Sequence, residues 1–352
     1  MILISSLGER ADVEDYLCRK MPIPCPSLRV TPEIEVAAPV PLFHAGSRMK
    51  RWLRRPAAVV LAVVAMALTA CGPDPAGPEA QVPAQPALWR ITDADTTIYL
   101  FGSIHMLPPG ASWRSEAVDR AMAASPVVYF EADVVGDPAG MLALVERLGR
   151  LPPSQTLSGS LSADQSLMLG AVAARLGLSR PALDAMQPWY AAVVISDAAI
   201  RAEGYRSEAG VDTQLRQDAT AAGKDLRFLE TVEQQLSALA GLPAQVQLDY
   251  LALTLAEAGE VKPLLARMVA AWRNGDVETL ARVLIAEDMA RLPALEEALL
   301  TRRNADWANR IDTLLDAEPG VFFMTVGAAH LVGDASVQTG LAARGRVAER
   351  LQ

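Results

Sequence analysis

Two stretches of the sequence, TTIYLFGSIH at residues 96–105 and GVFFMTVGAAH at residues 320–330, are built alike. Each begins with an apolar run that predicts a buried β-strand, and each ends in a glycine followed three residues later by a histidine. The glycines are Gly102 and Gly327, and the histidines are His105 and His330. Since glycine fills about 7% of positions in an average protein, a chance repeat of this spacing at both histidines has odds of roughly 0.5%.

The two glycines are predicted hinges. Glycine at a strand end lets backbone or ligand approach closely, and it tolerates dihedral angles that a side chain would forbid. In open α/β sheets, ligand sites lie in the crevice beyond the carboxyl ends of the strands. We therefore expect Gly102 and Gly327 to aim His105 and His330 into one crevice.

Two further predicted strands deliver carboxylates to their ends: Glu131 within VVYFEADV (127–134) and Glu230 within DLRFLET (225–231). An apolar strand that closes on a glutamate is costly unless the charge is paired or metal-bound. Two imidazoles with one or two carboxylates form a site of the nitrogen and oxygen type that suits Zn, Mn, Co or Fe. The sequence has no HExxH helix, which excludes the common zinc-protease pattern.

Each candidate also has a plain structural interpretation. A histidine after a strand is often only a structural hydrogen-bonding group, and Glu230 could equally cap the helix that follows it. Asp133 reads as a cap or turn residue. Arg303 and Asn304, in TRRNADW, could clamp a developing anion or could lie on a solvated helix face.

The pattern of strands and helices predicts an α/β (α+β) fold. Residues 88–103 read as a hairpin with a polar turn, 127–131 and 225–230 as short strands, and 344–350 as a final edge segment. Residues 231–317 contain no convincing strand and have helical apolar spacing. We expect a mixed β-sheet core of two halves with a large helical insertion.

The amino terminus reads as a targeting device. From Met49, a basic segment precedes an uncharged apolar run at residues 57–70, which is the layout of a secretory signal and is too short for a transmembrane helix. The run ends in LTAC, which resembles the lipobox of bacterial lipoproteins, so Cys71 is the predicted lipid anchor. An ordinary signal cut near Ala70 is the alternative.

These features divide the chain into four parts. Residues 1–48 are predicted to be a spurious or disordered extension, 49–71 the lipoprotein signal, 72–87 a Pro- and Ala-rich tether, and 88–352 the main domain. The predicted location is the periplasmic face of the cell envelope, with the outer membrane favoured because Gly72, not aspartate, follows Cys71.

Composition narrows the class of partner. The 352 residues carry a net charge of −9, which repels phosphate backbones, so nucleic acid is not expected as a partner. The three cysteines lie in the first quarter of the chain, so neither a disulfide framework nor a cysteine metal cluster is expected in the main domain.

At the paired GxxH motifs, with an acidic residue between them, the sequence resembles the TraB/GumN/PrgY family, whose distant animal members are the Tiki proteases. The resemblance runs from Leu88 to Gln352 and includes MQPWYAAV, GVDTQLRQDA and RFLETVEQQL. It departs from many members at Ala329, where they have a glycine before the second histidine. The family is related to the folds of haem-binding ChaN and of erythromycin esterase.

What the resemblance implies is a metal-dependent, peptidase-like core, with His105, His330 and Glu131 as its metal or catalytic group. In such a site a Mn, Co or Zn ion lowers the pKa of a bound water toward about 7, and Glu131 or Glu230 takes the water's proton, with Arg303 as a further catalytic candidate. The expected function is a membrane-tethered periplasmic hydrolase of peptides or proteins. The alternative is a non-catalytic lipoprotein that captures peptide or haem through the same histidines, associated with the envelope or with polysaccharide export.

Overall fold

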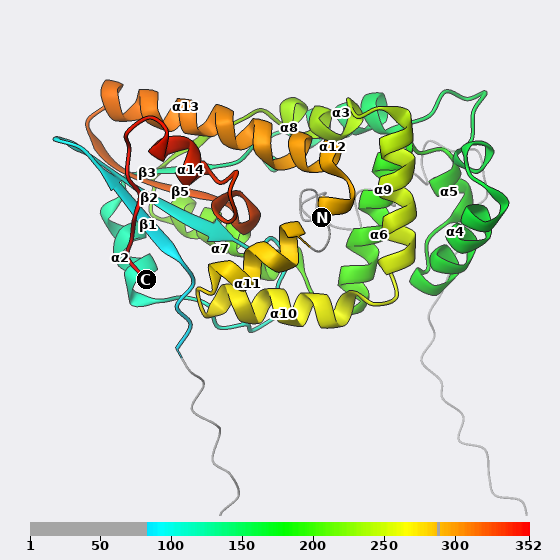
Figure 1. The fold of residues 1–352 in the computed structure, drawn as a ribbon, viewed down its shortest axis with the longest axis horizontal. Coiled ribbons are helices and arrows are strands. Elements are labelled where there is room, and N and C mark those ends of the chain that lie inside the picture. The colour runs from blue at the N-terminus through cyan, green and yellow to red at the C-terminus, as the bar shows by residue number, and fades with distance from the viewer. Residues whose placement is uncertain (1–82, 287–288) are drawn as a thin grey trace, which may run out of the picture. The chain divides into compact units, whose positions relative to one another are not determined.

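The computed structural model describes residues 83–286 and 289–352. Its centre is a six-stranded mixed sheet in the order β4-β3-β5-β2-β1-β6 (Figure 1). The strands are β1 (Leu88–Thr92), β2 (Thr96–Ser103), β3 (Val127–Phe130), β4 (Asp225–Phe228), β5 (Gly320–Gly327) and β6 (Glu349–Arg350). Strands β2, β3, β4 and β5 are parallel, while β1 is antiparallel to both β2 and β6. The predicted mixed α/β sheet is therefore confirmed.

The hairpin at the start of the domain is held by its polar turn. The Oδ1 atom of Asp93 accepts hydrogen bonds from the backbone N–H groups of Asp95 and Thr96, at 3.1 and 2.8 Å. An aspartate that bonds to the backbone two and three residues onward is a standard way to close such a turn. The turn sets β1 beside β2, and β2 pairs on its other edge with β5.

Helices fill both long connections between the parallel strands. Before β4 come α2 (Glu116–Ala124), α3 (Pro138–Gly149), α4 (Ala163–Leu176), α5 (Arg180–Asp184), α6 (Pro188–Ala202) and α7 (Val211–Ala221). Between β4 and β5 come α8 (Val232–Ala240), α9 (Ala244–Glu257), α10 (Val261–Arg273), α11 (Val277–Ala281), α12 (Pro293–Glu296) and α13 (Arg302–Ala317), and α14 (Val337–Ala342) follows β5. The expected helical insertion therefore exists.

Both faces of the sheet are covered, because the strands are apolar on both sides. Phe101 and Phe323 point into a large core shared with most helices, including α2, α10 and α11. Their neighbours Leu100 and Met324 point the other way, into a smaller core formed with α13 and α14. Figure 1 shows α13 and α14 on one side of the sheet and α10 and α11 on the other. The strand ends are thus enclosed by helices on both sides.

Local signals explain several helix boundaries. Pro188 is the first residue of α6, where its fixed φ suits a helix start, and α7 ends just before Gly223, whose φ of 64° suits a helix stop. Helix α2 begins at Glu116 because the side chain of Ser115 accepts a hydrogen bond from Val118 N and so caps the helix start.

The predicted extension (1–48), the predicted signal with Cys71 (49–71) and most of the predicted tether lie outside the described residues. Within residues 83–286 and 289–352, no helix is long and apolar enough to cross a membrane.

Candidate functional site

The two GxxH motifs leave the sheet at the same edge. Strands β2 and β5 are parallel neighbours in a register that pairs Gly102 with Val326 and Ser103 with Gly327. His105 follows in the loop after β2, and His330 lies in η6 (Ala328–Leu331), a short 3-10 turn directly after β5. The sequence repeat therefore becomes a spatial pair because both strands end at one level of the sheet.

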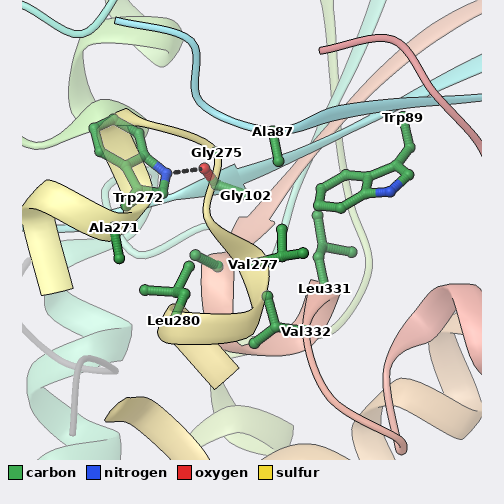
Figure 2. A pocket seen from close by; sticks show the side chains of 11 residues that line it. Ala87, Trp89, Gly102, Ala271, Trp272, Gly275, Val277, Leu280, Leu331 and Val332 are labelled. Carbon is green, nitrogen blue, oxygen red and sulfur yellow. Dashed lines mark hydrogen bonds between the residues drawn. The ribbon is translucent and has the colours of Figure 1, made fainter. Parts of the chain in front are cut away.

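Gly102 is needed for close packing between the motifs. A Cβ atom at this position would lie 3.1 Å from the Cα atom of Ala328, the first residue of the second motif's turn. The carbonyl of Gly102 accepts a 2.7 Å hydrogen bond from the indole of Trp272, which holds α10 against this strand end (Figure 2). A side chain here would separate the two motifs.

Gly327 is the point on which the predicted site residues converge. A Cβ atom there would lie 3.2 Å from Oε1 of Glu131, 3.3 Å from Nε2 of His105 and 3.7 Å from Cδ2 of His330. The φ of Gly327 is −51°, which any residue adopts, so its role is the close approach and not an unusual dihedral angle. The structure thus brings His105, Glu131 and His330 together around one glycine.

His105 is held by a carboxylate that the sequence interpretation did not select. Its Nδ1 atom lies 2.6 Å from Oδ2 of Asp212, in the first turn of α7. The helix start is pressed against the first motif: a Cβ on Gly210 would lie 2.1 Å from the carbonyl oxygen of His105, and Val211 N donates to Ile104 O. Burial by itself lowers the pKa of His105, but the charge and hydrogen bond of Asp212 raise it to about 9.

Glu131 is buried, and both of its oxygens are engaged. Oε1 accepts a 2.7 Å hydrogen bond from the backbone N–H of Gly327, and Oε2 accepts from Gln235 at 3.0 Å and from Arg303 at 2.8 Å. Burial raises the pKa of a carboxyl group, but Arg303 and the two histidines outweigh it and lower the pKa of Glu131 to about 2. Glu131 is therefore a fixed anion and a weak base.

Arg303 is buried at 6% exposure, so it does not lie on a solvated helix face. Arg303 donates two hydrogen bonds to Glu230, from Nε at 3.0 Å and from Nη2 at 2.6 Å. Nη2 also donates to Glu131. Nη1 faces the carbonyl of Leu299 at 2.9 Å and Nε2 of His330 at 3.1 Å. A guanidinium has five N–H donors. All five are occupied, so none remains to clamp a developing anion.

Glu230 does not cap the helix that follows. Thr231 caps α8 instead, through a capping box with Gln234. Glu230 faces Arg303. Burial raises the pKa of Glu230, and the hydrogen bonds and charge of Arg303 offset this increase only in part. In this arrangement Glu230 fixes Arg303, which in turn fixes Glu131.

His330 is more deeply buried than His105, at 3% exposure. Its Nδ1 atom lies 2.5 Å from Oδ1 of Asn304, and its Nε2 atom faces Arg303. Its ring centroid lies 4.4 Å from that of Trp307. Burial and the charge of Arg303 lower the pKa of His330 to about 3. His330 is thus a neutral ring that donates to Asn304 and accepts from Arg303.

A cavity of about 490 Å³ opens beside these groups. His105, Glu131 and Asp212 line its polar end, and the side chains of Phe130 and Val134 contribute to its apolar wall. Further lining residues come from the loop after β3, from η2 (Ser207–Ala209), from α7 and from α8: Ala132, Val135, Ser207, Thr213, Arg216, Gln217, Thr220, Ala221 and Gln235. Arg303, Glu230 and His330 do not line it. His105 is therefore the one histidine that lines the cavity in the described part of the chain.

The predicted metal ligands do not fit a divalent cation in this arrangement. Arg303 already supplies the positive charge between Glu131, Glu230 and His330, and both nitrogens of His330 contact protein groups. Among the described residues, no three or more His, Cys, Asp or Glu side chains are arranged to hold a metal ion. The Mn, Co or Zn ion stays a prediction.

The sequence interpretation missed Asp212 and Gln235. Asp212 lies 107 positions from His105 and Gln235 lies 104 positions from Glu131, so no local spacing connects either pair. One local feature does point to Asp212: Gly210, two residues earlier at a helix start, allows the helix to approach another segment closely. The expectation that Asp133 is a turn residue agrees with the structure, since its carboxylate accepts a 2.8 Å hydrogen bond from Gly136 N.

Comparison with known proteins identifies the class. The model of the TraB/PrgY/gumN family matches residues 87–350, so the chain belongs to this family. It is similar to the uncharacterized protein YbaP of Escherichia coli (strain K12), with 26% identity over 72% of this chain and 90% of that protein. It is also similar to the uncharacterized protein YbaP of Shigella flexneri, with 27% identity over 68% of this chain and 85% of that protein. No solved structure matches significantly.

Proposed function

We propose that this protein is an exported hydrolase of the cell envelope that cleaves peptide bonds, with His105 as its general base. The single observation that carries the proposal is the His105–Asp212 pair at the polar end of the cavity. A carboxylate on Nδ1 keeps the ring proton on that nitrogen and leaves Nε2 to exchange protons with a substrate or water. The resemblance to peptidase-like family members supports the choice of bond.

The reaction proceeds in two proton transfers. Neutral His105 accepts a proton at Nε2 from a water molecule as the water oxygen bonds to the substrate carbonyl carbon. The resulting imidazolium is stabilised by Asp212 and by the negative charge of Glu131. It then returns the proton to the amide nitrogen as the carbon–nitrogen bond breaks, so that acid and amine products leave and neutral His105 is regenerated.

The remaining residues of the cluster act through position. Arg303, held by Glu230 and His330, fixes the carboxylate of Glu131, and Gly327 N binds the other oxygen of that carboxylate. A fixed carboxylate beside His105 favours the charged form of the ring when it carries the proton. These residues support the base without contacting the cavity, except for Glu131, which lines it.

The test is turnover of a peptide library followed by mass spectrometry. The wild-type protein is expected to release cleaved products, and His105→Ala to lose about 10²- to 10⁴-fold in rate, the usual contribution of a general base. Arg120→Gln is the matched control, because it removes an exposed ion pair with Glu116 that does not line the cavity. Saturable peptide binding without product would support instead a non-catalytic binding protein.

The divalent cation is tested in the same assay. Because the donor atoms of Glu131 and His330 are engaged with protein groups, hydrolysis is expected to persist in a chelator. Inactivation by the chelator, reversed by Mn, Co or Zn, would support a metal-dependent hydrolase instead.

We also propose that the mature protein is a lipoprotein tethered through Cys71 at the periplasmic face of the cell envelope. The support is the sequence from Met49 to Cys71, with its basic start, short apolar run and lipobox-like end.

A further inference from the structure

We infer that the substrate carries a carboxylate next to the bond that is cleaved, and that Arg216 binds it. This inference rests on the proposed function and deepens it, because it assigns the substrate class of the same cavity. Apart from His105, Arg216 is the one basic side chain that lines this cavity in the described part of the chain.

The position of Arg216 relative to the proposed base is set by helix α7. Asp212, which holds His105, and Arg216 are four residues apart on this helix, and both line the cavity. Residues at this spacing lie side by side on one helix face, with Cβ atoms about 5–6 Å apart. One residue of peptide chain spans at most about 3.6 Å. A carboxylate bound by Arg216 would therefore place a carbonyl one residue away beside His105.

The guanidinium of Arg216 has donors to spare. Its Nη2 atom donates to Oδ1 of Asp133 at 2.7 Å, and its Cζ atom lies 5.6 Å from the ring centre of Phe228. Among the described residues, its other N–H groups have no hydrogen-bond partner. Since a guanidinium carries five donors, a substrate carboxylate can bind without displacing Asp133.

Charge balance also favours this role. Both carboxylates that line the cavity already have a partner: Glu131 is paired with Arg303, and Asp212 is hydrogen-bonded to His105. Asp133 does not line the cavity, and its side chain is 39% exposed, so its ion pair with Arg216 is weak and readily shared. Arg216 is therefore the cavity side chain that binds an incoming carboxylate most favourably.

The experiment compares matched substrates. Peptides cleaved by the wild-type protein are prepared with a free carboxyl terminus or as the terminal amide, and a second pair carries Asp or Asn beside the cleaved bond. At least one acid is expected to exceed its neutral partner in kcat/KM by about 10- to 100-fold, the range for a hydrogen bond to a charged group. The pair that shows the difference identifies the source of the carboxylate.

Two variants separate recognition from fold. Arg216→Gln should lower kcat/KM for the acid to the value for its neutral partner. Arg216→Lys should keep part of the preference for the acid, because lysine has the charge without the planar fork. Asp133→Asn should increase the preference, because it removes a competing carboxylate. Arg120→Gln, at a pair outside the cavity, should change neither substrate.

A binding measurement keeps this inference distinct from the proposed function. Titration calorimetry with N-acetyl dipeptide acids and amides requires no turnover. Preferential acid binding that depends on Arg216, with no hydrolysis of any peptide, would sustain the inference and overturn the hydrolase. Equal cleavage of acid and neutral substrates by the wild-type protein would overturn the inference and leave the hydrolase intact.

Discussion

The Nε2 atom of His330 lies 3.1 Å from Nη1 of Arg303, while Nδ1 of the same ring lies 2.5 Å from Oδ1 of Asn304. Both nitrogens of the second GxxH histidine therefore face protein groups. The first histidine differs: among residues 83–286 and 289–352, His105 is hydrogen-bonded through Nδ1 alone, to Asp212, and its ring lines the cavity. One sequence motif thus yields a histidine that lines the cavity at one strand end and a histidine enclosed by protein groups at the next.

Replacing His330 tests this division. His330→Ala removes the acceptor for Arg303 and the partner of Asn304 in a buried place, so the free energy of unfolding should fall by roughly 2–4 kcal/mol. His330→Gln, whose amide oxygen can accept from Arg303, should recover part of that stability and of the activity. Urea unfolding and metal analysis check both points. A stoichiometric metal in the wild type that is absent from both variants would make His330 a ligand.

The buried charges give a second prediction. Arg303→Met leaves the carboxylates of Glu131 and Glu230 buried without a cation, which should cost about 3–5 kcal/mol of stability at neutral pH. The further changes Glu131→Gln and Glu230→Gln should restore much of this loss, while activity should stay low. If Arg303→Met alone were as stable as the wild type, Arg303 would not be the cation that stabilises Glu131 and Glu230.

The ion pair of Glu131 with Arg303 also predicts how stability depends on pH. The pKa of Glu131 is lowered from 4.5 to about 2, so its stabilising contribution is present above pH 4.5 and is lost as the pH falls from 4.5 toward 2. In Arg303→Met the sign reverses near neutrality, because lowering the pH protonates the unpaired carboxyl groups and relieves their burial. Urea unfolding of both proteins at pH 7 and 5 separates the two behaviours.

The sequence alone sufficed for the sheet and for the meeting of the two motifs. Apolar runs ending in Gly102 and Gly327 predicted strands, and parallel neighbouring strands bring such ends to one edge. The burial of Glu131 was also predictable, since its strand is apolar up to Phe130. These inferences depended on local pattern and on general rules of sheet topology.

The partners of these residues could not be read in the same way. Arg303 lies 172 positions from Glu131 and 73 from Glu230, on a helix whose period gave no sign of which face is buried against a carboxylate. The sequence indicated that the buried carboxylates need a positive partner, for which we predicted a metal ion, and in the structure Arg303 bonds both of them. Local patterns predict that a buried charge has a partner, but only the fold determines which partner it has.

Export is tested at Cys71. If Cys71 is lipidated, Cys71→Ser should abolish incorporation of labelled palmitate and should release the protein from membrane fractions or leave it unprocessed. Persistent lipid labelling of Cys71→Ser would contradict the anchor.

The start of translation is tested separately. Translation beginning at Met49 should give export at least as good as the full reading frame, because the signal then starts the chain.

Gly210 provides a test of how Asp212 is positioned. A Cβ atom at Gly210 would lie 2.1 Å from the carbonyl oxygen of His105, so Gly210→Ala must push the start of α7 away from the first motif. We expect activity to fall at least tenfold, because the His105–Asp212 contact lengthens. Gly170→Ala, within α4 and away from the cavity, is the control: its Cβ atom would meet only the Arg180 side chain within 4 Å, at 3.3 Å, and activity should not change. Full activity of Gly210→Ala would contradict the role of this contact.

The pH–rate profile tests His105 as the base. The pKa of His105 is raised to about 9, so the neutral, proton-accepting form grows as the pH rises, and kcat/KM should increase with a midpoint near 9. Asp212→Asn removes the charge that raises this pKa, so the midpoint should move down toward the ordinary histidine value of 6.5 while the plateau falls by about 10²- to 10⁴-fold. A rate that decreases through pH 9 would make His105 a general acid instead.

Stability should move in the opposite direction to rate. Because the folded protein holds the proton of His105 more tightly than the unfolded chain does, the stabilisation is complete below pH 6.5 and is lost as the pH rises toward about 9. The wild type should therefore lose stability over this interval, and Asp212→Asn should lose much less. Titration of the His105 ring by NMR in both proteins gives the same pKa independently of turnover, and agreement between the ring titration and the rate profile would identify His105 as the group that controls the reaction.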